Sequence, residues 1–164
     1  MIRAFCTAAA LALLLVGASF AAERGPVTNL PMPRFVSMKA SEGNVRRGPS
    51  LSHRIDWVFK HRYMPLQITA EYGNWRRVAD RDGAGGWMHY TLLSGVRTVR
   101  VETALAPIYK LADTNSLVTA RLEKGVIARL GRCDAQLCRV SASGRKGWIL
   151  RGDIWGLLPG ETRE

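Results

Sequence analysis

The chain has 164 residues, of which 47% are hydrophobic and 23% charged, and its formal net charge is +11. This composition is typical of a folded protein, and it argues against a large multidomain enzyme, a collagen-like chain, a long coiled coil or a multispan membrane protein. The strong excess of Lys and Arg favours anionic partners.

The first 21 residues have the pattern of a secretory signal peptide. Arg3 is their only charge, residues 8–16 are an unbroken apolar run, and small residues follow. This order predicts cleavage after Ala21 and a periplasmic or secreted protein. An uncleaved membrane anchor is the alternative, because residues 4–22 are uncharged and just long enough to span a bilayer.

Residues 22–34 contain three prolines and are expected to form an extended N-terminal arm. The hairpin signal that follows is clear: residues 66–72 alternate apolar and polar, Gly73-Asn74 supplies a tight turn, and residues 75–78 return. No segment shows apolar residues at helical spacing over a dozen positions. Short alternating strands separated by glycine turns indicate small all-β barrels or sandwiches.

The rest of the chain repeats this pattern. Residues 66, 68 and 70 align with 126, 128 and 130 at an offset of 60, and residues 77 and 78 align with 139 and 140 at 62. Trp87 aligns with Trp148 at 61, and each follows a glycine. We therefore expect two units, at residues 35–95 and 99–158. Each unit is small enough to be marginally stable alone, so the two are expected to pack together.

Cys133 and Cys138 are the only cysteines beyond the signal sequence. An even number of cysteines in an exported chain predicts a disulfide between them. A metal site is disfavoured because no second cysteine pair or spaced histidine completes it. The spacing is also not that of a C-x-x-C redox motif. No metal or other cofactor is expected.

Three separated motifs in the first unit point to a family. They are GNVRRGPS at residues 43–50, the strand and turn of residues 63–78, and the Gly-Trp ending at residues 86–87. In this order they resemble the bacterial SH3-like domain, and the tandem resembles a family of exported alphaproteobacterial SH3-like proteins. The second unit looks like a diverged copy that carries APIYKLAD (residues 106–113) in place of the first motif. The resemblance implies a five-stranded barrel in each unit and a non-catalytic binding or scaffolding role, in some members toward cell-wall peptidoglycan.

Two groups of residues are candidates for ligand binding. Arginine pairs two oxygens of a carboxylate or phosphate at once, so Arg46 and Arg47, with the neighbouring Ser50, could line an anion-binding groove. Aromatic faces stack on sugar rings or peptides, which makes candidates of Tyr72, Trp75 and Tyr90. Trp87 and Trp148, which both units share, are expected to be structural. The alternative for residues 44–50 is also structural, with Val45 in the core and Asn44 bonded to turn backbone.

No catalytic constellation is apparent. The serines lack a nucleophile-elbow pattern, the three histidines form no recognisable site, and Asp80 and Asp82 are better interpreted as turn formers. The sequence therefore predicts a non-enzymatic envelope-binding module that recognises peptidoglycan or another anionic envelope ligand, with no nucleic-acid partner. A periplasmic protein–protein adaptor is the alternative, and an accessory subunit of a wall hydrolase is a weaker one.

Overall fold

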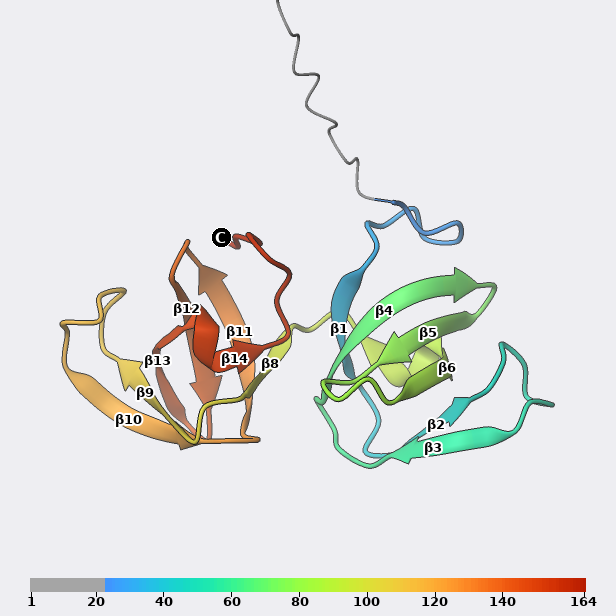
Figure 1. Cartoon of the computed structure of the whole chain (residues 1–164), viewed down its shortest axis with the longest axis horizontal. Coiled ribbons are helices and arrows are strands. Elements are labelled where there is room, and N and C mark those ends of the chain that lie inside the picture. The colour runs from blue at the N-terminus through green and yellow to red at the C-terminus, as the bar shows by residue number, and fades with distance from the viewer. Residues whose placement is uncertain (1–22) are drawn as a thin grey trace, which may run out of the picture.

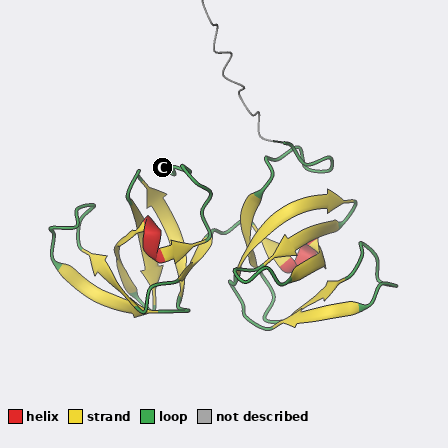
Figure 2. Ribbon diagram, viewed as in Figure 1, coloured by secondary structure: helices red, strands yellow, loops and turns green. Residues whose placement is uncertain are grey.

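The computed structural model describes residues 23–164, and the expected signal peptide and its cleavage site lie outside them. The described chain forms two antiparallel sheets, one from each half of the sequence (Figures 1 and 2). We refer to the sheet of strands β1–β7 as domain 1 and that of β8–β14 as domain 2. No helix of the described residues is long and apolar enough to cross a membrane.

Domain 1 has the strand order β3-β2-β6-β5-β4-β1-β7. A single turn of 3-10 helix, η1 (Tyr90–Leu92), leads into its last strand. The strands are β1 (Arg34–Met38), β2 (Gly43–Arg46), β3 (Ile55–Phe59), β4 (Pro65–Tyr72), β5 (Trp75–Ala79), β6 (Gly85–His89) and β7 (Leu93–Ser94).

Domain 2 repeats this topology in the order β10-β9-β13-β12-β11-β8-β14. A second 3-10 turn, η2 (Arg151–Asp153), stands before its last strand, as η1 does in domain 1. The strands are β8 (Thr98–Val101), β9 (Leu105–Tyr109), β10 (Val118–Glu123), β11 (Ile127–Cys133), β12 (Leu137–Ala142), β13 (Arg145–Leu150) and β14 (Ile154–Trp155).

The all-β class and the tandem arrangement are confirmed, with one difference in strand number. Each sheet has seven strands where five were expected, because the segment after the first strand is itself a paired hairpin. In domain 1 this hairpin is β2–β3, where Asn44 pairs with Val58. It extends the sheet beyond β6 and creates the surface described below.

Alternating strand residues build a separate core in each domain. Val45, Leu66, Ile68 and Val78 are buried together in domain 1, so Val45 points into the barrel as predicted. The corresponding core of domain 2 contains Val99, Val101, Ile108, Leu130, Val140 and Ile149. Side chains of a strand point alternately to its two faces, which is why the period-two pattern could be read from the sequence.

Strand pairing corrects the alignment of the two repeats. Ile68 pairs with Val78, and Leu130 pairs with Val140. Residue 68 therefore corresponds to 130 at an offset of 62, and the expected offset of 60 was wrong for this strand. The error left the inward faces correct, because a shift of two residues returns a strand side chain to the same face.

The shared Gly-Trp dipeptide marks a close crossing of two strands. A Cβ atom on Gly86 would lie 2.5 Å from the Arg46 carbonyl oxygen, and one on Gly147 would lie 2.6 Å from the Tyr109 carbonyl oxygen. Only glycine allows the hairpin strand to approach this closely. The glycine of the Gly-Trp motif is therefore required at both crossings, that of β2 with β6 in domain 1 and that of β9 with β13 in domain 2.

The N-terminal segment forms a closed loop in place of the expected extended arm. Backbone bonds from Gly25 to Leu30 and from Met32 to Glu23 close it. The loop folds over Glu71, whose side chain is 0% exposed and accepts bonds from the Val27 and Thr28 amides. A buried carboxylate requires such donors, and the loop supplies them.

The hairpins β4–β5 and β11–β12 are each linked across their strands at corresponding positions, but by different interactions. In domain 1, Glu71 pairs across the strands with Arg76, and their charged groups lie 3.6 Å apart. At the corresponding positions of domain 2, Cys133 pairs with Cys138, and the two form the predicted disulfide. A buried ion pair in one domain thus stands where the other has a covalent bond.

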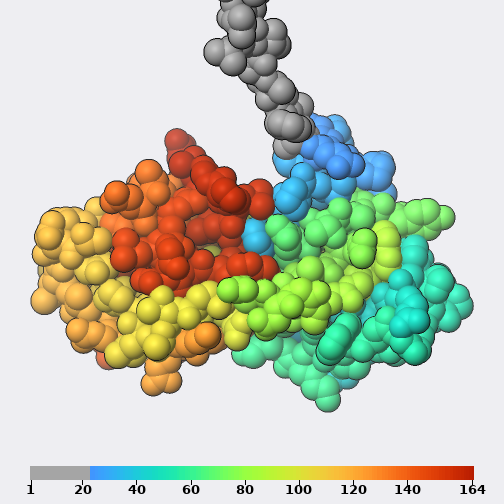
Figure 3. All heavy atoms as spheres, in the orientation of Figure 1, coloured from blue at the N-terminus to red at the C-terminus, as the bar shows by residue number. Residues whose placement is uncertain are grey.

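The domains touch through a small set of specific contacts, and the space-filling view shows them side by side (Figure 3). Phe35 packs edge-on against Trp155 with ring centroids 5.0 Å apart. The Thr98 hydroxyl donates to the Tyr63 carbonyl at 2.7 Å, and Arg81 pairs with Glu102 at 3.3 Å. The expected packing of the two units against each other is therefore observed.

Candidate functional site

Aromatic side chains form a row across three strands of domain 1. Tyr72 on β4 pairs with Trp75 on β5, which pairs with His89 on β6. Directly paired residues of a sheet project to the same face. The rings of Trp75 and His89 meet edge-on at 5.4 Å, and Tyr90 follows at 5.1 Å from His89. We call these four residues the aromatic row.

A groove of about 280 Å³ runs beside this row. Strand β2 forms one side, where Asn44 and Arg46 project outward because Val45 between them points into the core. Trp75 and His89 form the other side. The groove therefore combines flat ring surfaces with a guanidinium, an amide and an imidazole. Its remaining lining residues are Glu42, Gly43, Leu51 and Leu92.

Arg46 has a structural role as well as a place in the groove. One terminal nitrogen, Nη1, donates to the Leu51 carbonyl at 3.0 Å and to the His53 carbonyl at 2.8 Å. These bonds close the loop between β2 and β3. The other guanidinium nitrogens have no partner among residues 23–164, so they can donate to a ligand in the groove.

Two of the predicted site residues lie elsewhere. The Arg47 guanidinium pairs with Asp56 at 3.1 Å, and Arg47 lines a different depression with Arg77 and Trp87. Hydrogen bonds from Arg47 and Arg54 hold the pKa of Asp56 below its ordinary value. The Ser50 hydroxyl bonds to that of Ser52 within the loop. Arg46 is the last residue of β2 and Arg47 the first of the loop that follows, and their side chains diverge there.

Of the six predicted residues, Arg46 and Trp75 line the groove, while Tyr72 and Tyr90 belong to the aromatic row outside it. Two further residues of the groove were missed by sequence reasoning. The histidines were expected to form no recognisable site, yet His89 is the centre of the aromatic row. Asn44 was expected to bond turn backbone, but it is exposed on β2 and lines the groove. The sequence signal that could have placed Asn44 on the outer face is its position next to the apolar Val45, because neighbouring strand residues point to opposite faces.

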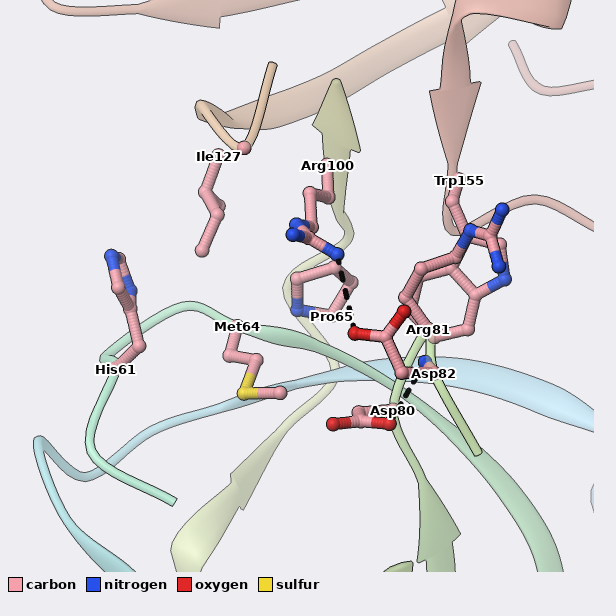
Figure 4. Close-up of a pocket in the computed structure, with 10 residues that line it drawn as sticks. His61, Met64, Pro65, Asp80, Arg81, Asp82, Arg100, Ile127 and Trp155 are labelled. Carbon is pink, nitrogen blue, oxygen red and sulfur yellow. Dashed lines mark hydrogen bonds and ion pairs between the residues drawn. The ribbon is translucent and has the colours of Figure 1, made fainter. Parts of the chain in front are cut away.

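A second hollow, of about 310 Å³, lies between the domains (Figure 4). Met64 and Pro65 line it from domain 1, and Ile127 and Trp155 from domain 2. Its charged rim is already paired: Arg100 lies 3.8 Å from Asp82 and 3.7 Å from Glu102. Asp80 acts as a turn former, since its carboxylate accepts the amides of Asp82 and Ala84.

Within residues 23–164, no group of three or more His, Cys, Asp or Glu side chains could hold a metal ion.

Comparison with known families agrees with this architecture. The family described as bacterial SH3 domain matches the chain twice, at residues 39–95 and 102–156. Together these matches cover more than half of the chain. The chain belongs to the bacterial SH3 domain family. The resemblance to tandem bacterial SH3-like proteins is therefore confirmed. Bacterial SH3 domains are typically cell-wall binding modules.

Two solved structures are also similar to this bacterial SH3 chain: NlpC2 and NlpC1 from Trichomonas vaginalis. Both are 12% identical in sequence, with TM-scores of 0.35 and 0.36. The alignments cover 75% and 80% of this chain, which spans 48% of the length of each neighbour. No curated protein matches the chain.

The second bacterial SH3 domain lacks the aromatic row. Strand pairing puts Leu137 and Leu150 at the positions of Trp75 and His89. The C-terminal segment also fastens to this end of the sheet, where Arg163 exchanges backbone bonds with Cys133. The candidate site is therefore a feature of domain 1 alone.

Proposed function

We propose that this protein is a non-enzymatic binding module of the cell envelope that recognises peptidoglycan through the groove of domain 1. The observation that carries the proposal is the row of Tyr72, Trp75 and His89 beside the Arg46 guanidinium. The proposal places the protein in the periplasm or outside the cell, after removal of residues 1–21. Membership of a family of typical cell-wall binding modules supports it.

The groove has suitable chemistry for a polymer of sugars and short peptides. The face of an aromatic ring offers a flat apolar surface for the C–H face of a sugar or for a peptide. A guanidinium with free N–H groups pairs a peptide carboxylate, and the Glu42 carboxylate can pair an ammonium group. Since the groove is open to solvent, we expect weak, salt-sensitive binding.

Replacing Trp75 by Leu, the residue at the corresponding position of domain 2, is expected to weaken binding at least tenfold. The substitution removes the ring at the centre of the row and keeps an apolar side chain. The measurement is cosedimentation of residues 22–164 with isolated sacculi across a salt series. Arg46→Lys should weaken binding but keep its salt dependence, because the planar fork is lost while the positive charge remains.

Trp57→Leu is the matched control for this experiment. Trp57 is 51% exposed on the edge strand β3 and does not line the groove. The control should sediment like the unmodified protein. Equal losses from both substitutions, or no pelleting of the unmodified protein at any salt concentration, would refute recognition by the groove.

An adaptor role is the second candidate, and the hollow between the domains favours it. Its apolar lining is contributed by both domains, so a partner seated there would contact both at once. Crosslinking in the periplasm should then capture a saturable protein partner. Substitution of Ile127 by Asp, and not Trp75→Leu, should abolish its capture.

A further inference from the structure

The outer face of domain 2 gathers basic side chains that none of the preceding roles uses. Residues 124–152 contain seven Lys and Arg but only one acidic residue, Asp134. Five of the seven stand on β11, β12 and β13, and Arg145 is the one that does not alternate with the buried side of its strand. We call the other four the cationic face: Arg129, Arg132, Arg139 and Lys146.

Strand register puts the members of this face side by side. Arg129 on β11 pairs with Ser141 on β12, which pairs with Lys146 on β13. Arg139 pairs with Trp148, and the Arg132 guanidinium lies over the same ring at 5.8 Å from its centroid. Arg129, Arg139 and Lys146 rim a shallow depression of about 310 Å³, in which Gly131 and Ser141 leave space.

These charges are uncompensated. All four side chains are exposed, and within the described residues 23–164 none forms an ion pair or donates a side-chain hydrogen bond. By contrast, seven other arginines of the described chain are paired with carboxylates, among them Arg34, Arg47 and Arg97. Clustering like charges on a rigid sheet is unfavourable unless an anion neutralises them.

The corresponding face of domain 1 is not cationic, which shows that the fold does not require these charges. Strand pairing puts Gln67, Ala79 and Gly85 where domain 2 has Arg129, Ser141 and Lys146. Only Arg77 corresponds to an arginine, Arg139. The second bacterial SH3 domain thus lacks the aromatic row at the hairpin end and carries a basic surface on its outer face.

We propose that the cationic face of domain 2 is a separate binding surface for a linear anionic polymer that carries phosphate groups along its length. Guanidinium forks suit phosphate oxygens, and strand register puts Arg129 and Lys146 about 10 Å apart with Arg139 as a diagonal neighbour of both, so the cations form an extended row. A bilayer surface fits less well. The outward residues beside the cations are Gly131, Ser141 and the half-buried Trp148, without an exposed aliphatic side chain to insert.

The test measures binding of residues 22–164 to long-chain inorganic polyphosphate over a range of salt concentrations. The triple substitution Arg129→Ala, Arg139→Ala, Lys146→Ala is expected to raise the Kd at least tenfold. It should also reduce the slope of log K against log salt by about two to three, since three cations no longer displace counterions. All three side chains are exposed, so the variant should fold normally, with unchanged circular dichroism and Tm.

The matched control removes three charges from domain 1 by Lys39→Ala, Lys60→Ala and Arg77→Ala. The control should retain most of the polyphosphate affinity, and Trp75→Leu should leave it unchanged, because the groove is a separate site. Equal losses from the two triple variants would attribute binding to net charge and overturn the proposal. Absence of polyphosphate binding, or stronger binding to phosphatidylglycerol vesicles than to the polymer, would also overturn it.

Discussion

Replacing Glu71 by Gln is expected to destabilise the protein by about 3–5 kcal/mol, the range found when one partner of a buried ion pair is removed. The Glu71 carboxylate is fully buried, and its Oε1 lies 2.6 Å from Arg34 and 3.6 Å from Arg76. Both arginine side chains are themselves largely buried, so the substitution leaves two cations without a counter-charge. Urea denaturation of the full exported chain, followed by tryptophan fluorescence, measures the loss.

The N-terminal loop should be released by the same substitution. One carboxylate oxygen, Oε2, accepts the amides of Val27 and Thr28, and the other, Oε1, accepts the Thr28 hydroxyl. Glutamine has one oxygen in place of two and its nitrogen only donates, so one of these two sets of bonds is lost. Gly25 approaches so closely that a Cβ atom there would lie 2.3 Å from Glu71 Oε2. Hydrogen exchange of residues 25–30 should therefore accelerate together with the fall in stability.

The pH dependence of the free energy of unfolding should also reflect the buried Glu71 carboxylate. Burial raises the pKa of Glu71, but hydrogen bonds from Thr28, Arg34 and Val27 outweigh this and lower the pKa from its ordinary 4.5 to about 2. The unfolded chain therefore binds this proton more tightly than the folded protein does. The stability that Glu71 contributes is complete above about pH 4.5 and is lost as the pH falls towards 2. In Glu71→Gln this part of the acid sensitivity should vanish.

Glu123→Gln is the matched control, because Glu123 is exposed at the end of β10. Its effect on the free energy of unfolding should stay within about 0.5 kcal/mol. If Glu71→Gln changed the free energy of unfolding as little as Glu123→Gln does, the buried cluster of Glu71, Arg34 and Arg76 would not stabilise domain 1 as its geometry indicates.

Phe35→Ala is expected to cost about 3 kcal/mol, at the lower end of the range for removing a buried phenylalanine. Phe35 is 5% exposed, and its ring is covered from domain 2 by the edge-on ring of Trp155 and by the Arg97 guanidinium at 5.7 Å. Because Phe35 lies on β1 but packs on the other domain, its loss should uncouple the two. Calorimetry should then show two unfolding transitions in place of one.

A double-mutant cycle with Trp155→Ala isolates the contact itself. The two rings should show a coupling free energy of about 0.5–1.5 kcal/mol, as edge-on aromatic pairs do beyond their burial. Additive effects, with a single unfolding transition retained in Phe35→Ala, would mean that other contacts join the domains.

The strand pattern and the repeat could be predicted from the sequence because both depend on local periodicity. The alternation of residues 66–72 and the Gly73-Asn74 turn located the β4–β5 hairpin closely. The extra hairpin β2–β3 escaped prediction because its strands are far apart for a hairpin, with residues 47–54 between them, and pair with a register shift that no local pattern reports. The closed N-terminal loop escaped for a similar reason: its prolines suggested extension, whereas the distant Glu71 holds the loop shut.

The candidate site was predictable in its residue types but not in its assembly. Arg46, Trp75 and their aromatic neighbours were apparent as unusual residues of the first unit. His89 joined them only through the register of β5 with β6, which no local pattern reports. Arg47 was wrongly assigned to the groove because two adjacent arginines look alike in a sequence, whereas only Arg46 stands on β2 and Arg47 begins the loop, where it pairs with Asp56.

The two domains show how one fold can be adapted at the same positions. In domain 1, the β4–β5 hairpin is stabilised by the Glu71–Arg76 ion pair, and Tyr72 and Trp75 occupy its other face. In domain 2, the β11–β12 hairpin is stabilised by the disulfide and pairs with the C-terminal segment. Domain 2 thus gives up the groove and, through its cationic face, presents a different surface to anions. The two proposals therefore predict that substitutions in one surface leave binding by the other unchanged.

The most direct test of the groove is an NMR titration of residues 22–164, labelled with nitrogen-15, with soluble muropeptides. Recognition by the groove predicts concerted shifts of the Trp75 indole N–H, the Asn44 side-chain amide and the His89 backbone amide, with little change in domain 2. Unchanged groove signals, or shifts confined to the hollow between the domains, would contradict the proposed function.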